Sequence, residues 1–517
     1  MSSRSRFATM LLVCWLGLSA AVRAEVKLPS VISENMVLQQ GLKAPIWGTA
    51  DAGEEITVTL GLQKASAKAG DDGKWKVQIG PLEAGGPFTM TIAGKNTIEF
   101  KNVLVGEVWV CSGQSNMQMS VNGCINAKDE IAAADFPKIR LFTVPTIAMP
   151  EPQTNCPGSW AECSPKNAGG FSAVAFFFGR ELFKTMNVPV GLIHTSWGGT
   201  PAEAWTSRPT LESDPDFKPI LDRFNKSVED YPKVRDGFPA QLEKWKEASE
   251  KAKAEGRSTP KKPNAPPDPM AKSNGWMPAG LYNAMIAPLI PYGIAGAIWY
   301  QGESNAGRAY QYRKLFAAMI QDWRKNWGQG DFPFFWVQLA NFMARAPQPG
   351  NSDWAELREA QQMTLSLPKT GTGLAIDIGD AGNIHPKNKQ EVGRRLALCA
   401  LAIAYGKSIP YSGPVYDSMA VEGSAVRLKF KHVNGGLVAK GDKLVGFSIA
   451  GEDRKFVWAD AKIDGETVVV SSPEVTKPVA VRYGWANNPD CSLYNKADLP
   501  ASPFRTDDWE GVTKGKL

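Results

Sequence analysis

Polar residues follow four apolar runs of this sequence, at the points where the runs end. The segments are 112–117 (S-G-Q-S-N-M), 195–200 (T-S-W-G-G-T), 301–306 (Q-G-E-S-N-A) and 377–386 (D-I-G-D-A-G-N-I-H-P). They offer hydroxyl groups, a glycine pair, side-chain amides and an imidazole. Acyl transfer requires a nucleophile, a base to take its proton and donors for the oxyanion that develops. The four segments therefore predict acyl-transfer chemistry.

Ser115 is the predicted nucleophile. It stands where an apolar strand turns into a helix, a position that exposes a hydroxyl and aims backbone N–H groups outward. The rival serines are Ser112, Ser196 and Ser304.

His385 is the predicted general base among the three histidines of the chain. His432 falls in a C-terminal stretch with a strand pattern, and His194 ends a strand beside the glycines, where a buried structural role is expected. His385 precedes a proline in a polar loop, and the alternative is a surface histidine without a catalytic role.

The predicted oxyanion hole combines the N–H of Ser115, an N–H from Gly198 or Gly199, and the amide of Gln301 or Asn305. Losing one such donor costs roughly 10²- to 10³-fold in rate. The alternative is a tight turn for the glycines and a helix cap for the asparagine.

Three regions are predicted along the chain. Residues 25–102 show short strands between turn signals, which indicates a small β-sandwich. In 103–410 apolar runs alternate with helical stretches, which predicts an α/β domain whose parallel sheet is covered on both faces. Residues 206–274 are charged and proline-rich, so we expect a surface insertion there, and 411–517 predict a second β region.

The composition excludes some functions. The chain has 517 residues, 43% of them hydrophobic, which is enough for a large core, and its net charge of +6 forms no basic run. Nucleic-acid binding is therefore not predicted. The histidines and cysteines do not have the spacing of a metal site, so we expect neither a metal nor an organic cofactor.

The first 24 residues predict a signal peptide cleaved before Glu25. Arg4 and Arg6 precede an apolar stretch over 8–21, and V-R-A ends the segment. A membrane anchor is the alternative, but the stretch is shorter than the roughly 20 residues that a span needs. We therefore expect an exported protein, periplasmic or extracellular.

Six cysteines follow the signal peptide, an even number for an oxidising compartment, so some disulfides are predicted. Proximity favours Cys156 with Cys163. Cys399 lies in an apolar helix pattern and is expected to be a buried thiol.

The chain resembles the sialate O-acetylesterase family of the SGNH hydrolases. The resemblance runs from about Leu28 to Asp507 and is carried by G-Q-S-N-M, S-W-G-G-T-P-A-E-A-W, W-Y-Q-G-E-S-N-A, and D-I-G-D with I-H-P-K-N-K. It implies a flavodoxin-like SGNH sheet with β domains attached and the hydrolysis of acetyl esters on sugars. The four polar segments correspond to the nucleophile, glycine, amide and histidine blocks of that family.

One position departs from the pattern of many SGNH enzymes, which place an aspartate three residues before the histidine. Here that position is Gly382. Asp380, or less favourably Asp377, is a candidate to orient His385, and a backbone carbonyl that accepts the Nδ1 proton is the preferred alternative. Both aspartates are equally compatible with a role in the turn.

Several other residues have two readings. Glu303 and Arg358 are predicted to form a buried pair that braces the site. Four tryptophans either stack on sugar or pack in the core: Trp197, Trp205, Trp299 and Trp485.

The expected partner is an O-acetylated sugar or glycan, with no nucleic acid and no membrane after signal cleavage. Two rivals remain at this point: an esterase acting on acetylxylan or another polysaccharide, and an exported carbohydrate-binding protein without catalysis. The oligomeric state is not predicted.

Overall fold

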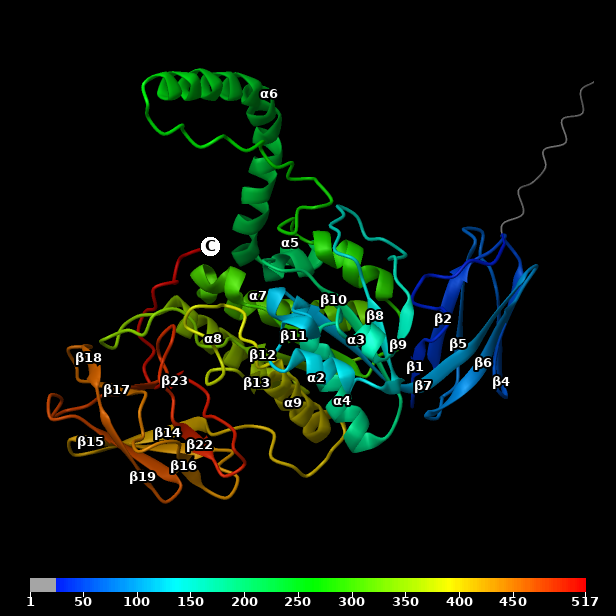
Figure 1. Ribbon diagram of the computed structural model, residues 1–517. Helices are drawn as coiled ribbons and strands as arrows, with labels where there is room; N and C mark the ends of the chain where they lie inside the picture. Colours follow the sequence, from blue (N-terminus) through cyan, green and yellow to red (C-terminus); the bar gives the residue numbers. More distant parts are fainter. Residues whose placement is uncertain (1–24) are drawn as a thin grey trace, which may run out of the picture.

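A computed structural model describes residues 25–517, and the predicted signal peptide lies outside the described residues. The chain forms a central α/β region with a β region on either side (Figure 1). Within the described residues, none of the helices is both long and apolar enough to cross a bilayer.

The central sheet has the strand order β13-β12-β11-β7-β10-β8-β9, and all neighbours are parallel except β8 and β9. Its strands are β7 (Thr97–Gly113), β8 (Phe136–Thr143), β9 (Trp160–Cys163), β10 (Val190–Ser196), β11 (Gly296–Tyr300), β12 (Phe334–Gln338) and β13 (Thr370–Leu374). Strands β10, β11 and β12 are buried at every residue, as expected for a parallel sheet covered on both faces. The predicted α/β class is confirmed.

The order in which the chain adds strands to the sheet reverses at strand β7. The chain first builds β8 and β10 on one side of β7 and then β11, β12 and β13 on the other. In open α/β sheets, ligands bind beyond the carboxyl ends of the strands at such a switch point. Ser115 follows the carboxyl end of β7 by two residues.

Helices cover both faces of the sheet. Helices α4 and α9 pack against each other, as do α7 and α8. Their bounds are α4 (Ala173–Met186), α7 (Ala309–Trp327), α8 (Asp353–Met363) and α9 (Lys389–Cys399), and the shorter helices are α1 (Ser115–Gln118), α2 (Ala127–Ala132) and α3 (Pro165–Ala168).

The N-terminal β region shares strand β7 with the central sheet. The first part of β7 pairs with β1 and β6, and its second part pairs with β10 and β11. The boundary predicted after residue 102 therefore falls inside one strand, and the two regions share a continuous hydrophobic core. The other strands here are β1 (Val37–Gln39), β2 (Ala44–Thr49), β3 (Glu55–Leu60), β4 (Gln63–Lys68), β5 (Lys74–Ile79) and β6 (Gly85–Ala93).

The C-terminal β region has a hydrophobic core of its own, which runs from Val426 to Phe504. Two four-stranded sheets and one two-stranded ladder enclose it. The strands are β14 (Val415–Glu422), β15 (Ala425–Lys431), β16 (Leu437–Ala439), β17 (Phe447–Ala450), β18 (Phe456–Trp458), β19 (Asp460–Asp464), β20 (Thr467–Ser471), β21 (Ala480–Tyr483), β22 (Leu493–Asn495) and β23 (Phe504–Arg505).

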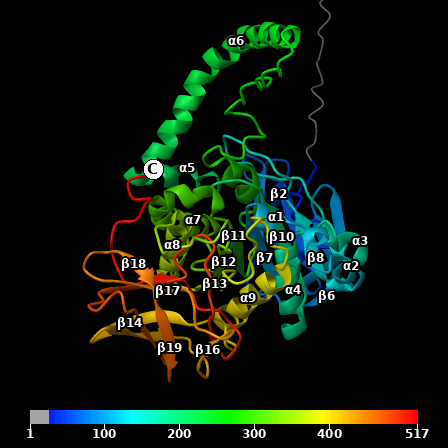
Figure 2. The same ribbon diagram turned by 60° about the vertical axis from the view of Figure 1, so that its left-hand side comes forward.

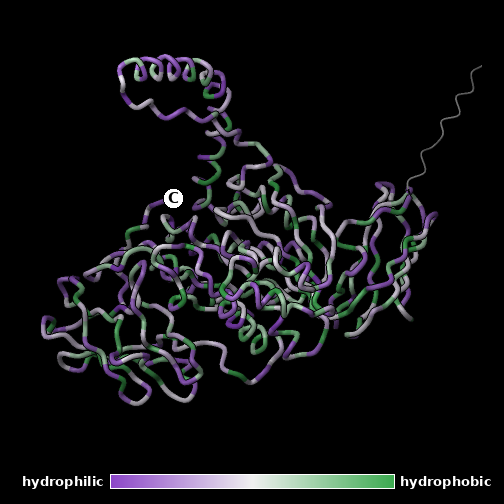
Figure 3. The backbone as a smooth tube through the Cα atoms, in the orientation of Figure 1, coloured by the Kyte–Doolittle hydropathy of each residue, from purple (hydrophilic) through white to green (hydrophobic). Residues whose placement is uncertain are grey.

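The charged segment over 206–274 contains α5 (Arg208–Ser213) and the 37-residue helix α6 (Lys218–Ala254). Helix α6 projects from the body of the protein and bends along its length (Figures 1 and 2). Pro232 and Pro239 lie inside it, and an internal proline removes a backbone hydrogen bond and kinks a helix. Its residues are mainly hydrophilic (Figure 3), and only four of them are buried.

The six cysteines of residues 25–517 are free thiols, so the predicted disulfides, including Cys156 with Cys163, are not formed in the described chain. Burial raises the pKa of Cys156, Cys163 and Cys399 to about 12. These thiols are protonated and unreactive at neutral pH.

Candidate active site

The turn that carries Ser115 is set by its glycine. Strand β7 ends at Gly113, whose φ is +135° and where a Cβ would lie 2.2 Å from the carbonyl oxygen of Tyr300. Only glycine fits this approach. Ser115 then begins helix α1 and is half-buried, whereas Asn116 and Met117 are buried. Because the first N–H groups of a helix have no partner within it, the N–H of Ser115 is free to bind an oxyanion.

The glycine loop after β10 touches this turn. A Cβ on Gly198 would lie 3.2 Å from the Cβ of Ser115, so the structure brings these two predicted site residues together. The N–H of Gly198 donates to Oε1 of Gln118 at 2.9 Å, and because Gln118 is exposed, its side chain can turn away from this donor. Gly199 is exposed and has a φ of +74°.

Gln301 and Asn305 brace the glycine loop from below. Nε2 of Gln301 donates to Oδ1 of Asn305 at 2.6 Å and to the carbonyl oxygen of Thr200 at 3.2 Å. Asn305 accepts from the N–H of Ala202 and donates to Glu203. Both amides are buried and engaged with protein groups, and their direct contact with an oxyanion stays a prediction.

The loop that carries His385 is tied to the serine turn. Nδ2 of Asn116 donates to the carbonyl oxygen of Ile384 at 3.0 Å, so the neighbour of Ser115 binds the neighbour of His385. His385 is half-buried, and burial together with the positive charge of Lys389 lowers its pKa. The imidazole therefore stays neutral, as a base must, to lower pH than an exposed histidine. A hydrogen bond between its ring and the Ser115 hydroxyl stays a prediction.

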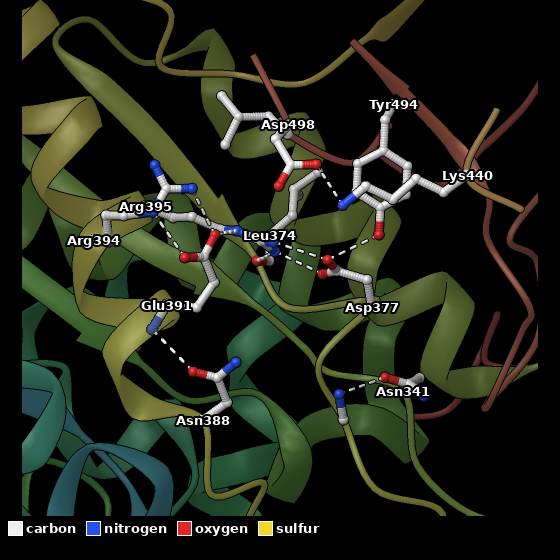
Figure 4. A network of polar contacts seen from close by, with 12 residues as sticks. Asn341, Leu374, Asp377, Asn388, Glu391, Arg394, Arg395, Lys440, Tyr494 and Asp498 are labelled. Atoms are coloured by element: carbon white, nitrogen blue, oxygen red, sulfur yellow. Dashed lines mark hydrogen bonds and ion pairs between the residues drawn. The ribbon is translucent and has the colours of Figure 1, made fainter. Parts of the chain in front are cut away.

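The two candidate carboxylates serve other contacts. Asp380 is exposed, and its Oδ1 accepts from the N–H of Gly382 at 2.8 Å, which closes the turn. Asp377 binds Arg395 of α9 at 2.6 and 2.8 Å and accepts from the Tyr494 hydroxyl at 2.9 Å (Figure 4). Besides burial, the charged group that lowers the pKa of His385 is Lys389, and the group that orients the imidazole stays a prediction.

The Asp377 network joins the central region to the C-terminal β region, because Tyr494 lies in β22. Burial alone would raise the pKa of Asp377, but the hydrogen bonds and charge of Arg395 outweigh burial and lower it. A carboxylate whose pKa is lower in the folded state stabilises the fold above its unfolded pKa, near 3.8. That stabilisation is lost as the pH falls through the folded pKa.

We expect Asp377→Asn to lower the free energy of unfolding by about 2 kcal/mol at neutral pH, because it removes the charge that binds Arg395. The difference from wild type should shrink in acid, where Asp377 is itself protonated. Urea unfolding at neutral pH and in acid measures this difference in the free energy of unfolding. Asp417→Asn, at the more exposed ion pair with Lys431, is the matched control and should have little effect. An equal loss from both substitutions would contradict the prediction.

Two of the three rival serines are buried. Ser112 and Ser196 are buried, and the hydroxyl of Ser196 is 2.6 Å from Nε2 of His194. Burial lowers the pKa of His194 to about 4. This serine–histidine pair is enclosed beneath the site. Ser304 is half-buried in the segment after β11.

The predicted pair of Glu303 and Arg358 is wrong. Arg358 instead donates to four carbonyl oxygens, those of Leu339, Ala340, Ala486 and Asn487. Glu303 accepts from Nδ2 of Asn116 at 2.8 Å, and Nζ of Lys389 donates to Oδ1 of the same asparagine at 2.6 Å. Sequence reasoning missed Asn116 and Lys389, although both stand within the quoted motifs, G-Q-S-N-M and I-H-P-K-N-K.

Most of the tryptophans singled out pack in the core. Trp205 and Trp299 are fully buried, and Trp485 lies under the guanidinium groups of Arg482 and Arg505. Trp197 is half-buried in the glycine loop.

A tryptophan that was not singled out, Trp276, is 56% exposed beside that loop. A Cβ on its neighbour Gly275 would lie 2.8 Å from Cγ2 of Thr200 and 3.4 Å from the ring of Trp197. Trp276 thus offers a stacking surface close to the glycine loop.

Known proteins are similar to this chain in sequence and in fold. Residues 271–402 match the family of sialic acid-specific acetylesterases among the carbohydrate esterases. A sialate O-acetylesterase of Rattus norvegicus is 32% identical over 549 residues, covering 96% of this chain and 97% of the relative. One of Homo sapiens is 30% identical over 543 residues, covering 95% and 94%.

A solved structure, a carbohydrate acetylesterase from Xanthomonas citri, is 37% identical and has a TM-score of 0.80, covering 94% of this chain and 100% of that one. These similarities assign the present chain to the carboxylic ester hydrolases. The chain belongs to the sialate O-acetylesterase family.

Proposed function

We propose that this protein hydrolyses O-acetyl esters of sugars, with an acetylated sialic acid as its substrate, through Ser115 as nucleophile and His385 as base. The observation that carries the proposal is the convergence of the polar segments: Gly198 lies next to Ser115, and Asn116 binds the residue before His385. The membership of the sialate O-acetylesterase family supports the substrate class.

In the first half of the reaction, Oγ of Ser115 bonds to the acetyl carbonyl carbon while His385 takes the hydroxyl proton. The oxyanion accepts from the N–H of Ser115 and from Gly198 or Gly199, in a loop held by Gln301 and Asn305. The bond between the carbonyl carbon and the sugar oxygen then breaks, and that oxygen takes the proton from His385.

In the second half, His385 deprotonates a water molecule, which attacks the acetyl group on Ser115. The bond between the acetyl carbon and Oγ breaks, acetate leaves and the serine hydroxyl regains its proton. The partly buried, neutral imidazole suits both proton transfers.

A cavity of about 280 Å³ beside helix α6 supports an acidic sugar as the substrate. Its lining includes Glu203, Trp276, Arg223 and Arg308. Arg308 pairs with Glu203 at 2.6 Å, and Arg223 donates to the main-chain oxygen of Leu517, so a bound carboxylate would accept from their remaining N–H groups. Guanidinium groups bind carboxylates well, and an exposed indole stacks on sugar rings. Sialic acid carries a carboxylate, whereas xylan is neutral.

Acetate release from a panel of substrates tests the function. We expect faster release from O-acetylated sialic acid than from acetylxylan. Because the arginines attract the carboxylate, the preference should fall as salt is added. Equal or faster release from acetylxylan would assign the polysaccharide substrate instead, and no acetate from any ester would overturn the proposed activity.

The N-terminal sequence supports an exported enzyme, and we propose that it works in the periplasm or outside the cell.

A further inference from the structure

A buried asparagine links three separate segments of the site. Asn116 follows Ser115 directly, and its side chain binds Glu303 after β11, Ile384 in the histidine loop and Lys389 at the start of α9. Its Oδ1 faces an ammonium group, which only donates, and its Nδ2 faces a carboxylate and a carbonyl, which only accept. Asparagine therefore fits this position in a single orientation.

Lys389 is an unusual residue to bury. Its relative exposure is 0%, and its Nζ lies 2.6 Å from Oδ1 of Asn116 and 5.2 Å from the centre of the Tyr300 ring. It is also the first residue of α9, where the helix dipole disfavours a cation. Burial lowers its pKa to about 7. Stability alone does not account for a lysine in this place.

Glu303 is the second costly group. One carboxylate oxygen accepts from Asn116, and the other is buried without a hydrogen-bond partner among the described residues. Burial raises its pKa. Buried charged groups rarely improve stability over apolar residues of similar size, although breaking an existing set is costly. Such groups beside a nucleophile point to a functional role.

We propose that Asn116, Glu303 and Lys389 form a buried positioning cluster that holds the Ser115 turn and the His385 loop in register. The cluster binds the residue after Ser115 and the residue before His385, and Lys389 fixes the chain four residues beyond the histidine. This inference rests on the proposed function, because it gives the cluster a role only if Ser115 and His385 act together. Its members are positioning residues and do not touch the substrate.

The cluster also acts on His385 through charge. The titratable groups that face Lys389 are Glu303, Cys124, Tyr300 and His385 itself. Burial lowers the pKa of Lys389 to about 7, and the charge of Lys389 adds to burial in lowering the pKa of His385. In its charged form, Lys389 opposes protonation of the imidazole. Without it, the pKa of His385 rises.

The test compares Lys389→Met with Lys387→Met, measured with p-nitrophenyl acetate from acidic to mildly alkaline pH. Lys387 is exposed two residues away, so the control makes the same chemical change in the same loop. We expect Lys389→Met to lower kcat about 10- to 100-fold, because small misplacements of reacting groups cost this much. Its KM should change less than about threefold. The acidic limb of kcat/KM should move to higher pH, and Lys387→Met should behave as wild type.

A folded Lys389→Met protein with unchanged kcat, or with an unmoved acidic limb, would overturn the inference. If that variant does not fold, Asn116→Asp replaces it, because this change keeps the shape but turns the donor toward Ile384 and Glu303 into an acceptor. A fall in kcat at nearly constant KM supports the cluster, and wild-type kcat refutes it. Ser115→Ala runs in parallel: if it keeps full activity, the proposed mechanism has failed rather than the cluster alone.

Discussion

Ser115→Ala is expected to lower kcat for ester hydrolysis by about 10⁴-fold or more, the largest effect of any single substitution in the chain. In the proposed mechanism, the change removes the oxygen that attacks the acetyl carbon of the ester. KM should change little, because the oxyanion donors and the sugar contacts remain. Steady-state kinetics with p-nitrophenyl acetate and with an acetylated sialic acid measure both quantities.

Ser196→Ala is the matched control for this result. Ser196 also pairs with a histidine, at 2.6 Å from Nε2 of His194, but both residues are buried below the surface where a substrate binds. Its loss should leave most of the activity. Thermal melting shows whether both variants are folded. If folded Ser196→Ala were inactive and folded Ser115→Ala active, the assignment of Ser115 as the nucleophile would be wrong. Full activity in both would leave neither serine as the nucleophile.

The class of fold was predictable because its signals are local. Apolar runs followed by polar turns marked the strands β7, β10, β11 and β13, and each candidate site segment begins within three residues of its strand end. The shared strand was not predictable in the same way. A boundary was predicted after residue 102, where the character of the sequence changes, yet residues 97–113 form the single strand β7, whose first part is partly exposed and whose second part is buried.

The partners of buried charges were the hardest feature to predict. Arg358 was expected to meet Glu303, and its guanidinium instead satisfies four backbone carbonyls. A carbonyl leaves no trace in the sequence, because every residue has one. The prediction of disulfides was wrong for a related reason. An even number of cysteines allows pairing, but pairing depends on where each thiol points, and all six cysteines of residues 25–517 are free.

Gly382 stands where many SGNH enzymes have an aspartate, and the cluster gives the imidazole a charged neighbour of opposite sign. Where an aspartate supports the catalytic histidine, it adds a negative charge and raises the basicity of the imidazole. Here the charged neighbour is Lys389, which has the opposite effect on the pKa of His385. In the proposed mechanism this arrangement keeps the base neutral further into acid, and we expect the loop that Asn116 anchors to orient the ring.

His385→Ala tests that base directly, and we expect kcat to fall about 10²- to 10⁴-fold, the usual contribution of general base catalysis. The wild-type profile of kcat/KM should rise with pH through an apparent pKa below 6.5, because burial and Lys389 disfavour the imidazolium form. The variant should lose this limb, and added imidazole should restore part of its rate.

His432→Ala is the matched control, since the His432 ring packs edge-on against Tyr411, with ring centroids 5.3 Å apart, and is also half-buried. It should keep both the rate and the acidic limb. A limb that persists in His385→Ala would mean that another group titrates. Because the chain has only three histidines and His194 is enclosed, Glu303 and Lys389 would be the first candidates, since burial shifts their pKa values toward neutrality. The experiment therefore separates a histidine base from the cluster that supports it.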